Sequence, residues 1–314
     1  MKRGFLLMNT GSPAAPTEAA LQVYLKEFLM DPYVIDLPFP LRYALVHWII
    51  LAKRPAKSAR AYKTIWTDHG SPLVHYSTNL AVGLNHQLND PVEIGMAFGS
   101  PSAESALEKL LAQGVDEICL LPMFPHAAMA TTGGCTALVK KRLKGRATLR
   151  VAPPFYDHPK LIDPLAHSLE GIQEYILFSY HGLPIRHLKK QPAPDYHVQC
   201  LATTQAVVKK VGLTDDQYSV SFQSRLGRDP WLEPDTEDVL SKLPALGKKK
   251  LAVICPSFFC DCLETLEEIE LRGRKIFMDA GGESFRMIPC LNDSPVAFQC
   301  LETLMAQADD WLIQ

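Results

Sequence analysis

The sequence predicts an α/β protein built from parallel sheets that carry helices on both faces. Short apolar runs alternate along the chain with longer stretches of helical periodicity, an order typical of parallel strands joined by helical crossovers. The runs are almost continuously apolar rather than alternating, as expected for strands that are buried on both faces. With 314 residues, 47% of them hydrophobic, the chain is long enough for two domains and can bury a full core.

Each apolar run that is short and ends in turn residues is predicted to be a strand. The strands expected in chain order are Phe5–Met8, Val92–Ala97, Glu117–Leu121, Leu149–Val151, Tyr175–Ser179, Tyr218–Phe222 and Leu251–Cys255. The helices expected between and after them are Glu18–Phe28, Ser71–Leu88, Ser102–Ala112, Cys135–Lys144, Leu161–Tyr175, Val198–Val211, Thr236–Lys242, Asp261–Arg272 and Pro295–Trp311. The first run is too short for the apolar part of a signal peptide, and no small-residue cleavage site follows it.

The chain divides into two halves that each hold about four strand–helix units. The proline-rich segment Ala152–Lys160 is the best linker between them. We therefore expect one domain over residues 1–152 and a second over residues 153–314. The last helix is expected to pack back on the first domain.

Composition excludes several classes of protein. The chain carries 32 Lys and Arg against 34 Asp and Glu, so it lacks the basic surface of a nucleic-acid-binding protein. No apolar window of about 18 residues would span a bilayer. The eight cysteines in a chain of this size, without an export signal, are expected to be reduced thiols. The G-x-G-x-x-G, G-x-x-x-x-G-K-[ST] and G-x-S-x-G motifs are absent.

His181 is the strongest candidate for chemistry. Ligands of parallel α/β sheets bind beyond the carboxyl ends of the strands, and His181 lies two positions beyond the predicted strand Tyr175–Ser179, before Gly182 and Pro184. A histidine there could act as a general base or a metal ligand, because its unperturbed pKa is near neutrality. The alternative, that it only caps a turn, is about as frequent.

An acidic stretch follows the strand at Leu251–Cys255. Asp261, Glu264, Glu268 and Leu271 are spaced by three, four and three residues, which predicts one shared helix face. Stacked carboxylates repel one another, but they can pass a divalent cation inward or take up protons. The plainer interpretation is a solvated helix face, with Asp261 as the N-cap.

Two other features have weaker functional interpretations. The spacing of Cys255, Cys260 and Cys262 does not match zinc or ferredoxin motifs, so buried packing is the expected role. Trp231 stands between Pro230 and Pro234. It is interpreted as a core aromatic or as a flat surface against a planar ligand.

Taken together, several segments resemble the ferrochelatases, enzymes that insert ferrous iron into a porphyrin. The resemblance covers nearly the whole chain, and its motifs come in the order of the family. They are Leu6-Leu7-Met8-Asn9-Thr10-Gly11-Ser12-Pro13, Gly70-Ser71-Pro72-Leu73, Ser179-Tyr180-His181-Gly182-Leu183-Pro184, Phe222-Gln223-Ser224-Arg225, Pro230-Trp231-Leu232 and Asp261-Cys262-Leu263-Glu264-Thr265-Leu266. The enzymes of Gram-negative bacteria are the most similar in character.

The resemblance implies two Rossmann-like domains of the chelatase type, each a parallel four-stranded sheet flanked by helices, with the porphyrin in the cleft between them. It implies that His181 is the proton acceptor and an iron ligand, and that Glu264 is its acidic partner. Asp261 and Glu268 match acidic positions along the metal route. Porphyrin-contacting positions correspond to Thr10, Lys53, Arg54, Tyr62, Ser71 and Trp231, of which Lys53 and Arg54 suit the propionates.

By the same resemblance, the substrates are protoporphyrin IX and Fe²⁺, the product is protoheme, and the pathway is heme biosynthesis. No organic cofactor and no [2Fe–2S] cluster is expected. The alternatives are a coproporphyrin ferrochelatase, a cobalt chelatase and, outside the enzymes, a two-lobed tetrapyrrole-binding protein. In the first domain, Ala97-Phe98 and Phe124-Pro125-His126-Ala127-Ala128 replace polar residues of many relatives.

The segment 38–52 matches the lip over the porphyrin mouth. Its side chains Trp48, Ile49, Ile50 and Leu51 would form an apolar patch if exposed, which suggests contact with the ligand or with a membrane surface. Ordinary helix burial is an equal alternative. The protein is expected in the cytoplasm, with peripheral contact to the inner membrane through this segment.

Overall fold

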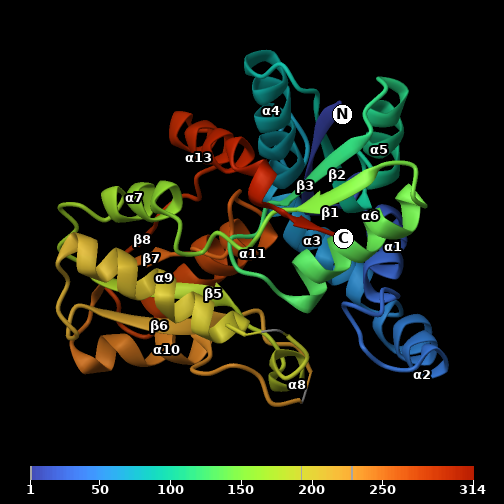
Figure 1. Cartoon of the computed structure of the whole chain (residues 1–314). Coiled ribbons are helices and arrows are strands. Elements are labelled where there is room, and N and C mark those ends of the chain that lie inside the picture. Colours follow the sequence, from blue (N-terminus) through green and yellow to red (C-terminus); the bar gives the residue numbers. More distant parts are fainter. Residues whose placement is uncertain (1, 192, 228) are drawn as a thin grey trace. The chain divides into compact units, whose positions relative to one another are not determined.

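The computed structural model describes residues 2–191, 193–227 and 229–314. The chain forms two compact units (Figure 1). Unit 1 comprises Met1–Pro153 and Asp293–Gln314, and unit 2 comprises Pro154–Asn292. Residues 293–314, which the sequence analysis assigned to the second domain, thus belong to unit 1. Their helix α13 (Pro295–Ala306) packs beside α4 (Pro72–Gln87).

Unit 1 contains a five-stranded sheet with the order β2-β1-β3-β4-β9. Its strands are β1 (Arg3–Ser12), β2 (Val92–Gly99), β3 (Glu117–Pro122), β4 (Thr148–Val151) and β9 (Leu312–Ile313). The first four are parallel to their neighbours, as predicted. The expected number of four strands was wrong for this sheet, because β9 pairs antiparallel with β4. A pair of exposed residues at the chain end carries no pattern that identifies a strand.

Seven α-helices, two π-helical segments and one 3₁₀ turn complete the described part of unit 1. Side chains start two of the helices: the hydroxyl oxygens of Thr17 and Ser102 accept bonds from the backbone N–H of Ala20 and Ser105. The helices are α1 (Glu18–Leu29), α2 (Phe39–Ala44), α3 (Arg54–Ile65), α4, α5 (Ala103–Ala112), α6 (Gly134–Leu143) and α13, with π-helical segments at Leu45–Ile50 and Met129–Gly133 that continue α2 and precede α6, and a 3₁₀ turn at Ala308–Asp310.

The core of unit 1 lies against its central strands. All six residues of β3 are buried, so this strand is covered on both faces, as its continuous apolar run predicted. Helices α5 and α6 contribute Leu107, Leu110 and Val139 to the same cluster. Each fully buried aliphatic side chain of this kind stabilises the fold by about 1.5–3 kcal/mol.

Gly11 allows the end of β1 to run close to β2. Its φ is 102°, and a Cβ at this position would lie 1.8 Å from the carbonyl oxygen of Phe98. Only glycine can adopt this conformation without displacing the neighbouring strand. The constraint explains why a glycine follows Asn9 and Thr10 in the first motif.

Unit 2 contains a parallel four-stranded sheet, as expected, with the order β6-β5-β7-β8. Its strands are β5 (Tyr175–His181), β6 (Tyr218–Gln223), β7 (Lys250–Ile254) and β8 (Ser284–Met287). The sequence analysis missed β8, because its four residues include exposed Arg286 and form no apolar run. The sheet packs against helical residues that include Leu240, Ile269 and Phe277.

The helices of unit 2 correct two predictions. Helix α7 ends at His167 rather than Tyr175, and Gly171 beyond it has a φ of 74°. The acidic helix begins at Leu263 rather than Asp261 and contains a π-helical stretch. The helical segments are α7 (Pro159–His167), α8 (Ile185–Leu188), α9 (Tyr196–Val211), α10 (Thr236–Lys242), the 3₁₀ turn Leu243–Leu246, α11 (Leu263–Thr265), the π-helical segment Leu266–Gly273 and α12 (Arg274–Asp279). None of the described helices has both the length and the apolarity to cross a bilayer.

A buried carboxylate joins both ends of the chain in unit 1. Glu117 is 2% exposed and accepts hydrogen bonds from Arg3 Nε at 2.8 Å and Arg150 Nε at 2.7 Å. Arg3 also pairs with Asp309, and Arg150 Nη1 donates to the carbonyls of Asp309 and Trp311. Burial opposes the ionisation of Glu117, but the two arginines outweigh it and hold its pKa below the usual value.

We expect Glu117→Gln to destabilise unit 1 by about 2–3 kcal/mol at neutral pH. This is less than the roughly 3–5 kcal/mol for a fully buried pair, because both arginines are partly exposed. A carboxyl whose pKa is lowered by folding stabilises the fold above its unfolded pKa, and the contribution is lost as pH falls through the folded pKa. Urea unfolding should therefore show a difference in the free energy of unfolding between the parent and Glu117→Gln that becomes smaller as the pH falls. The control Glu108→Gln removes an exposed pair with Arg146 and should change the midpoint little; equal effects of the two substitutions would contradict the argument.

Candidate functional site

His181 is the last residue of β5, at the carboxyl end of the sheet. Its backbone N–H donates to Ser257 Oγ at 3.0 Å, and its carbonyl accepts from the Tyr196 hydroxyl at 2.9 Å. The ring Nδ1 lies 2.7 Å from the carbonyl oxygen of Gly182. Because a carbonyl only accepts, Nδ1 carries the proton, and Nε2 of the neutral ring has a free lone pair. The half-buried imidazole is thus oriented to accept a proton or bind a metal through Nε2.

Gly182 lets two loops meet behind His181. A Cβ on Gly182 would lie 2.6 Å from the carbonyl oxygen of Gln223 and 3.4 Å from Trp231 Cε3. Backbone bonds from Leu232 to Leu183 and from Ile185 to Pro230 join the same loops. Trp231 is therefore packed against the loop that carries His181. Its buried indole N–H has no hydrogen-bond partner in the described part of the chain.

Gln223 holds the acidic helix over the sheet end. It is 1% exposed and pairs in register with His181 across β5 and β6. Its Oε1 accepts from Ser179 Oγ at 2.8 Å, and its Nε2 donates to the carbonyl oxygen of Glu264 at 2.7 Å. The sequence analysis quoted this residue in a motif without giving it a role; its place directly after a strand was the available signal.

The helix that carries Glu264 and Glu268 has a wider turn than predicted. In a π-helical turn each backbone hydrogen bond spans five residues instead of four. Side chains four residues apart therefore stay on nearly the same face, whereas side chains three residues apart point in different directions. Leu271 is accordingly 45% exposed, whereas the Glu268 side chain is 11% exposed. The prediction that Leu271 shares the face of the glutamates was wrong for this reason. π-helical segments are frequent at functional sites.

Ser224 fixes the carboxylate of Glu268. Its backbone N–H and its hydroxyl each donate to one carboxylate oxygen at 2.7 Å. Arg272 lies 3.7 Å from Oε1. Burial raises the pKa of Glu268 above its usual value, with a further increase from nearby Glu264, and the bonds from Ser224 and the charges of Arg272 and His181 only partly compensate. Glu268 therefore lies within electrostatic range of both proposed catalytic residues and takes up a proton more readily than a free carboxyl.

Asp261 lies before the helix and not on its face. It is 4% exposed, and its carboxylate accepts hydrogen bonds from Thr265 Oγ1 at 2.8 Å and Asn292 Nδ2 at 2.7 Å. The predicted common face was wrong for Asp261, because the helix starts two residues later, at Leu263. Asp261 connects that start to the segment after β8.

The other predicted porphyrin-contacting residues lie in three places in unit 1. Thr10 is half-buried near the end of β1. Lys53 is exposed and Arg54 half-buried at the start of α3, and Tyr62 is 8% exposed two turns later in that helix. Ser71 is 6% exposed and precedes α4 as its N-cap residue. Three of the five residues therefore depend on α3, a helix that the sequence analysis did not predict.

The two segments of unit 1 that replace polar residues of many relatives, Ala97-Phe98 and Phe124–Ala128, include a buried histidine. His126 is 2% exposed, and burial lowers its pKa to about 3, so its imidazole is neutral at physiological pH. Ala97 is half-buried and Phe98 is 8% exposed. These segments therefore carry no charged side chain, as their sequence indicated.

The eight cysteines are all free thiols, and seven are buried. Burial raises the pKa of Cys255, Cys262 and Cys290 well above the usual value, so the three are protonated at physiological pH. Within the described ranges, no three or more His, Cys, Asp and Glu side chains are arranged to hold a metal ion.

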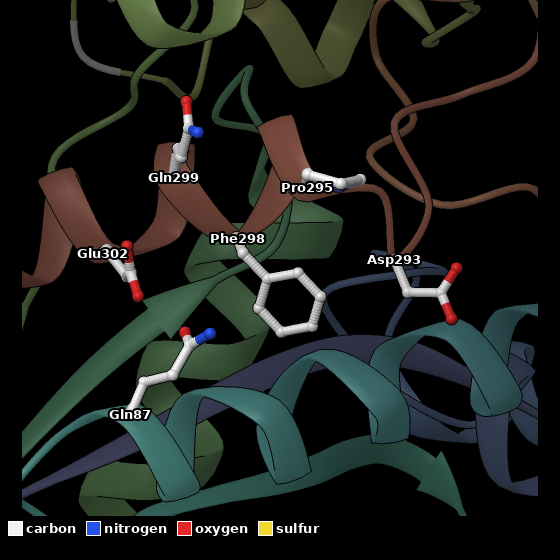
Figure 2. A pocket seen from close by; sticks show the side chains of 6 residues that line it. All are labelled: Gln87, Asp293, Pro295, Phe298, Gln299 and Glu302. Atoms are coloured by element: carbon white, nitrogen blue, oxygen red, sulfur yellow. The ribbon is translucent and has the colours of Figure 1, made fainter.

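A hollow of about 410 Å³ between α4 and α13 lies apart from the predicted residues. Figure 2 shows the Phe298 ring inside it, with the ends formed by Asp293 and by the Gln87 and Glu302 side chains. Gly83 of α4 leaves room for the ring, since a Cβ there would lie 2.4 Å from Phe298 Cε1. None of the predicted site residues lines this hollow.

Comparisons with known proteins agree with the motifs. The family model Ferrochelatase matches residues 2–309. Ferrochelatases of Pseudomonas putida and Ectopseudomonas mendocina are 46% and 45% identical over 96% of this chain, and the matches cover 98% and 97% of those proteins. Two structures of SirB from Bacillus subtilis, one with Fe³⁺ and one of the sirohydrochlorin chelatase with cobalt, align over 98% and 99% of this chain and 96% and 97% of theirs. Both have a TM-score of 0.58 at 13% identity, which shows a common chelatase-type fold. On the near-complete family match and the identity to those relatives, the chain belongs to the ferrochelatase family.

Proposed function

We propose that this chain is a lyase of heme biosynthesis that inserts Fe²⁺ into protoporphyrin IX, giving protoheme and two protons. The carrying observation is the free Nε2 of His181 at a sheet end that also holds Glu264 and Glu268. Metallation replaces two pyrrole N–H protons with one divalent cation. It therefore needs a proton acceptor and negative charge near the ring, and these residues supply both.

His181 is proposed as the proton acceptor. The hydrogen bond from Nδ1 to Gly182 leaves Nε2 to take a pyrrole proton, and the same bond stabilises the imidazolium that forms. Glu264 is proposed as the acidic partner, and the two residues together as ligands of the incoming iron. The anchoring of the Glu264 backbone to Gln223 supports this, because it fixes the helix relative to the strand that ends in His181.

Asp261 and Glu268 are proposed to line the metal route. Carboxylates at low exposure attract a divalent cation more strongly than carboxylates in water. Glu268 can exchange a proton for the cation, because its pKa is raised. Asp261, whose oxygens are occupied by hydrogen bonds, would contribute charge rather than a metal–oxygen bond.

The porphyrin is proposed to contact Thr10, Tyr62 and Ser71 of unit 1, with its propionates on Lys53 and Arg54. Both cations start α3, and a guanidinium pairs well with a carboxylate. In unit 2, Trp231 is proposed to provide a flat surface. Protoporphyrin IX is preferred over coproporphyrin III because the side chains of the segment at 38–52 are apolar; coproporphyrin, or cobalt as the metal, would be the outcome of a substrate screen that contradicts this choice.

No resident cofactor is proposed for the reaction. Iron enters and leaves as Fe²⁺, so the chemistry has no redox step and requires neither an organic cofactor nor a [2Fe–2S] cluster. The burial of Cys255, Cys260 and Cys262 supports packing as the role of these thiols.

A cytoplasmic protein with peripheral membrane contact through residues 38–52 is proposed. Phe39, Leu41, Trp48 and Ile49 are 60–74% exposed, so this apolar segment is not covered by unit 1. The next helix, α3, carries the exposed cations Lys57, Arg60 and Lys63 and no acidic residue, and its N-cap residue Lys53 is also exposed. The apolar segment 38–52 could insert into a bilayer while the basic residues of α3 bind anionic lipid headgroups.

We expect His181→Ala to lower the rate of iron insertion by about 10²–10⁴-fold, the usual contribution of a general base. Purified protein would be assayed anaerobically with Fe²⁺ and protoporphyrin, and its circular dichroism compared with the parent. His167→Ala is the matched control, since the His167 side chain is 82% exposed. Turnover of His181→Ala near that of the parent would contradict the assignment.

We expect Glu264→Gln to bind porphyrin normally but to insert iron at least about tenfold more slowly, because the amide keeps the shape but carries no charge. Porphyrin fluorescence quenching measures binding, and heme absorbance measures insertion. Glu267→Gln is the control on the neighbouring position of the helix, where the side chain faces Arg272 at 3.7 Å. If both substitutions are equally harmful or equally harmless, the role of Glu264 is wrong.

We expect the double variant Trp48→Ala, Ile49→Ala to bind vesicles at least about tenfold more weakly, because each large apolar side chain contributes roughly 1.5–3 kcal/mol when removed from water. Flotation with phosphatidylglycerol vesicles and with phosphatidylcholine vesicles would measure binding and its dependence on charge. Val23→Ala removes an equally exposed side chain, 70% accessible, from α1 and should leave binding unchanged. Equal binding of the parent and the double variant would refute the contact.

A further inference from the structure

Asn292 and Asp261 form a reciprocal pair in unit 2. The backbone N–H of Asp261 donates to Asn292 Oδ1 at 2.8 Å, and Asn292 Nδ2 donates to Asp261 Oδ2 at 2.7 Å. Asn292 is the last residue of unit 2 in sequence. We propose that Asn292 is a positioning residue for iron insertion: through Asp261 it holds the start of the helix that carries Glu264. The inference rests on the function proposed above.

The path from Asn292 to Glu264 consists of hydrogen bonds, and those beyond Asn292 lie between buried groups. Asp261 Oδ1 accepts from Thr265 Oγ1 at 2.8 Å, and the same hydroxyl oxygen accepts from the backbone N–H of Cys262 at 3.0 Å. Asp261 and Thr265 are 4% and 0% exposed, so water does not compete for these bonds. Thr265 is next to Glu264, and the short helix α11 contains only these two residues and Leu263. A shift of Asp261 would therefore move the Glu264 backbone directly.

Asparagine suits position 292 in conformation and in chemistry. Its φ is 52°, a left-handed conformation that asparagine tolerates better than most residues. Its backbone N–H donates to the carbonyl of Phe259 at 3.1 Å. Its amide offers the acceptor that the Asp261 N–H needs and the donor that the Asp261 carboxylate needs. Aspartate would keep the acceptor and replace the donor with a second negative charge.

Among the described residues, two cysteine thiols interact electrostatically with Asp261. Cys290 faces it from the segment after β8, with its backbone N–H 3.4 Å from Oδ1, and Cys255 faces it from the end of β7. Burial raises the pKa of both thiols well above the usual value. A carboxyl introduced at position 292 would thus face Asp261 as the dominant new charge.

Two substitutions test the role in the full-length protein. Asn292→Gly removes the amide but keeps the left-handed backbone conformation at no strain. Asn292→Asp places two carboxylates at hydrogen-bond distance, and such a pair ionises fully only at high pH. Insertion of Fe²⁺ into protoporphyrin would be measured between about pH 6 and about pH 8.5, with kcat and KM separated and the folded fraction taken from circular dichroism.

The matched control is Asn79→Ala. Asn79 Nδ2 donates to Asp293 Oδ2 at 2.7 Å, so it holds the residue directly after Asn292, but within unit 1 and without a link to Glu264. Asp293 lies on the segment that leads into α13, as Figure 2 shows. This variant should keep kcat within about twofold of the parent.

We expect Asn292→Gly to lower kcat by about 10–100-fold at every pH, the effect of a displaced catalytic group, while KM for porphyrin changes less than about threefold. Asn292→Asp should be as slow at high pH and recover toward the parent as the pH falls, because a shared proton restores the bond. Parent-like kcat in both variants, or losses that only follow the folded fraction, would overturn the inference. Failure of the parent to insert iron would instead refute the proposed function.

Discussion

The side-chain amide of Gln223 is the interaction on which the arrangement of unit 2 depends. It is buried at the end of β6, accepts from Ser179 of β5 and donates to the backbone of the acidic helix. A parallel sheet places the ends of adjacent strands at one edge, but it does not by itself determine where the next helix begins. The amide supplies that link, because it has a donor and an acceptor that point in different directions. His181 and Glu264 are therefore positioned by the same residue.

The carboxylates around this link differ because their environments differ. Glu268 is fixed by two donors from Ser224 and is close to Glu264 and His181. Asp261 is anchored to Thr265 and Asn292 and lies off the helix. A π-helical turn between residues 266 and 273 keeps Glu264 and Glu268 on neighbouring positions. Three acidic residues at helical spacing thus have different environments: Glu264 is held through its backbone carbonyl, Glu268 through its carboxylate, and Asp261 lies in a hydrogen-bonded anchor before the helix.

The parallel strands and their order of helices could be predicted because their apolar runs are nearly continuous. His181 could be placed at a strand end because β5 stops where Gly182 and Pro184 begin. The start of the acidic helix could not be predicted, because Asp261 is a residue type favoured as an N-cap. Only its hydrogen bonds to Asn292, 31 residues away, show that it anchors the chain before the helix. The π-helical turn could not be predicted either, because the sequence pattern of residues 266–273 is the same as that of an α-helix. Strands β8 and β9 were missed because four residues and two residues are too short to show a pattern.

Arg3 and Arg150, which Glu117 holds, bind the segment around Asp309, and these bonds have a consequence for synthesis on the ribosome. The sheet of unit 1 is completed by β9, which pairs with β4 only after residues 154–292 have been made. Unit 2 is continuous in sequence and can therefore fold while unit 1 still lacks α13 and β9. During that interval the outer edge of β4 is unpaired and the arginines have not yet met Asp309. An exposed strand edge is a site for wrong pairing, so unit 1 is open to aggregation while the residues of unit 2 are being made.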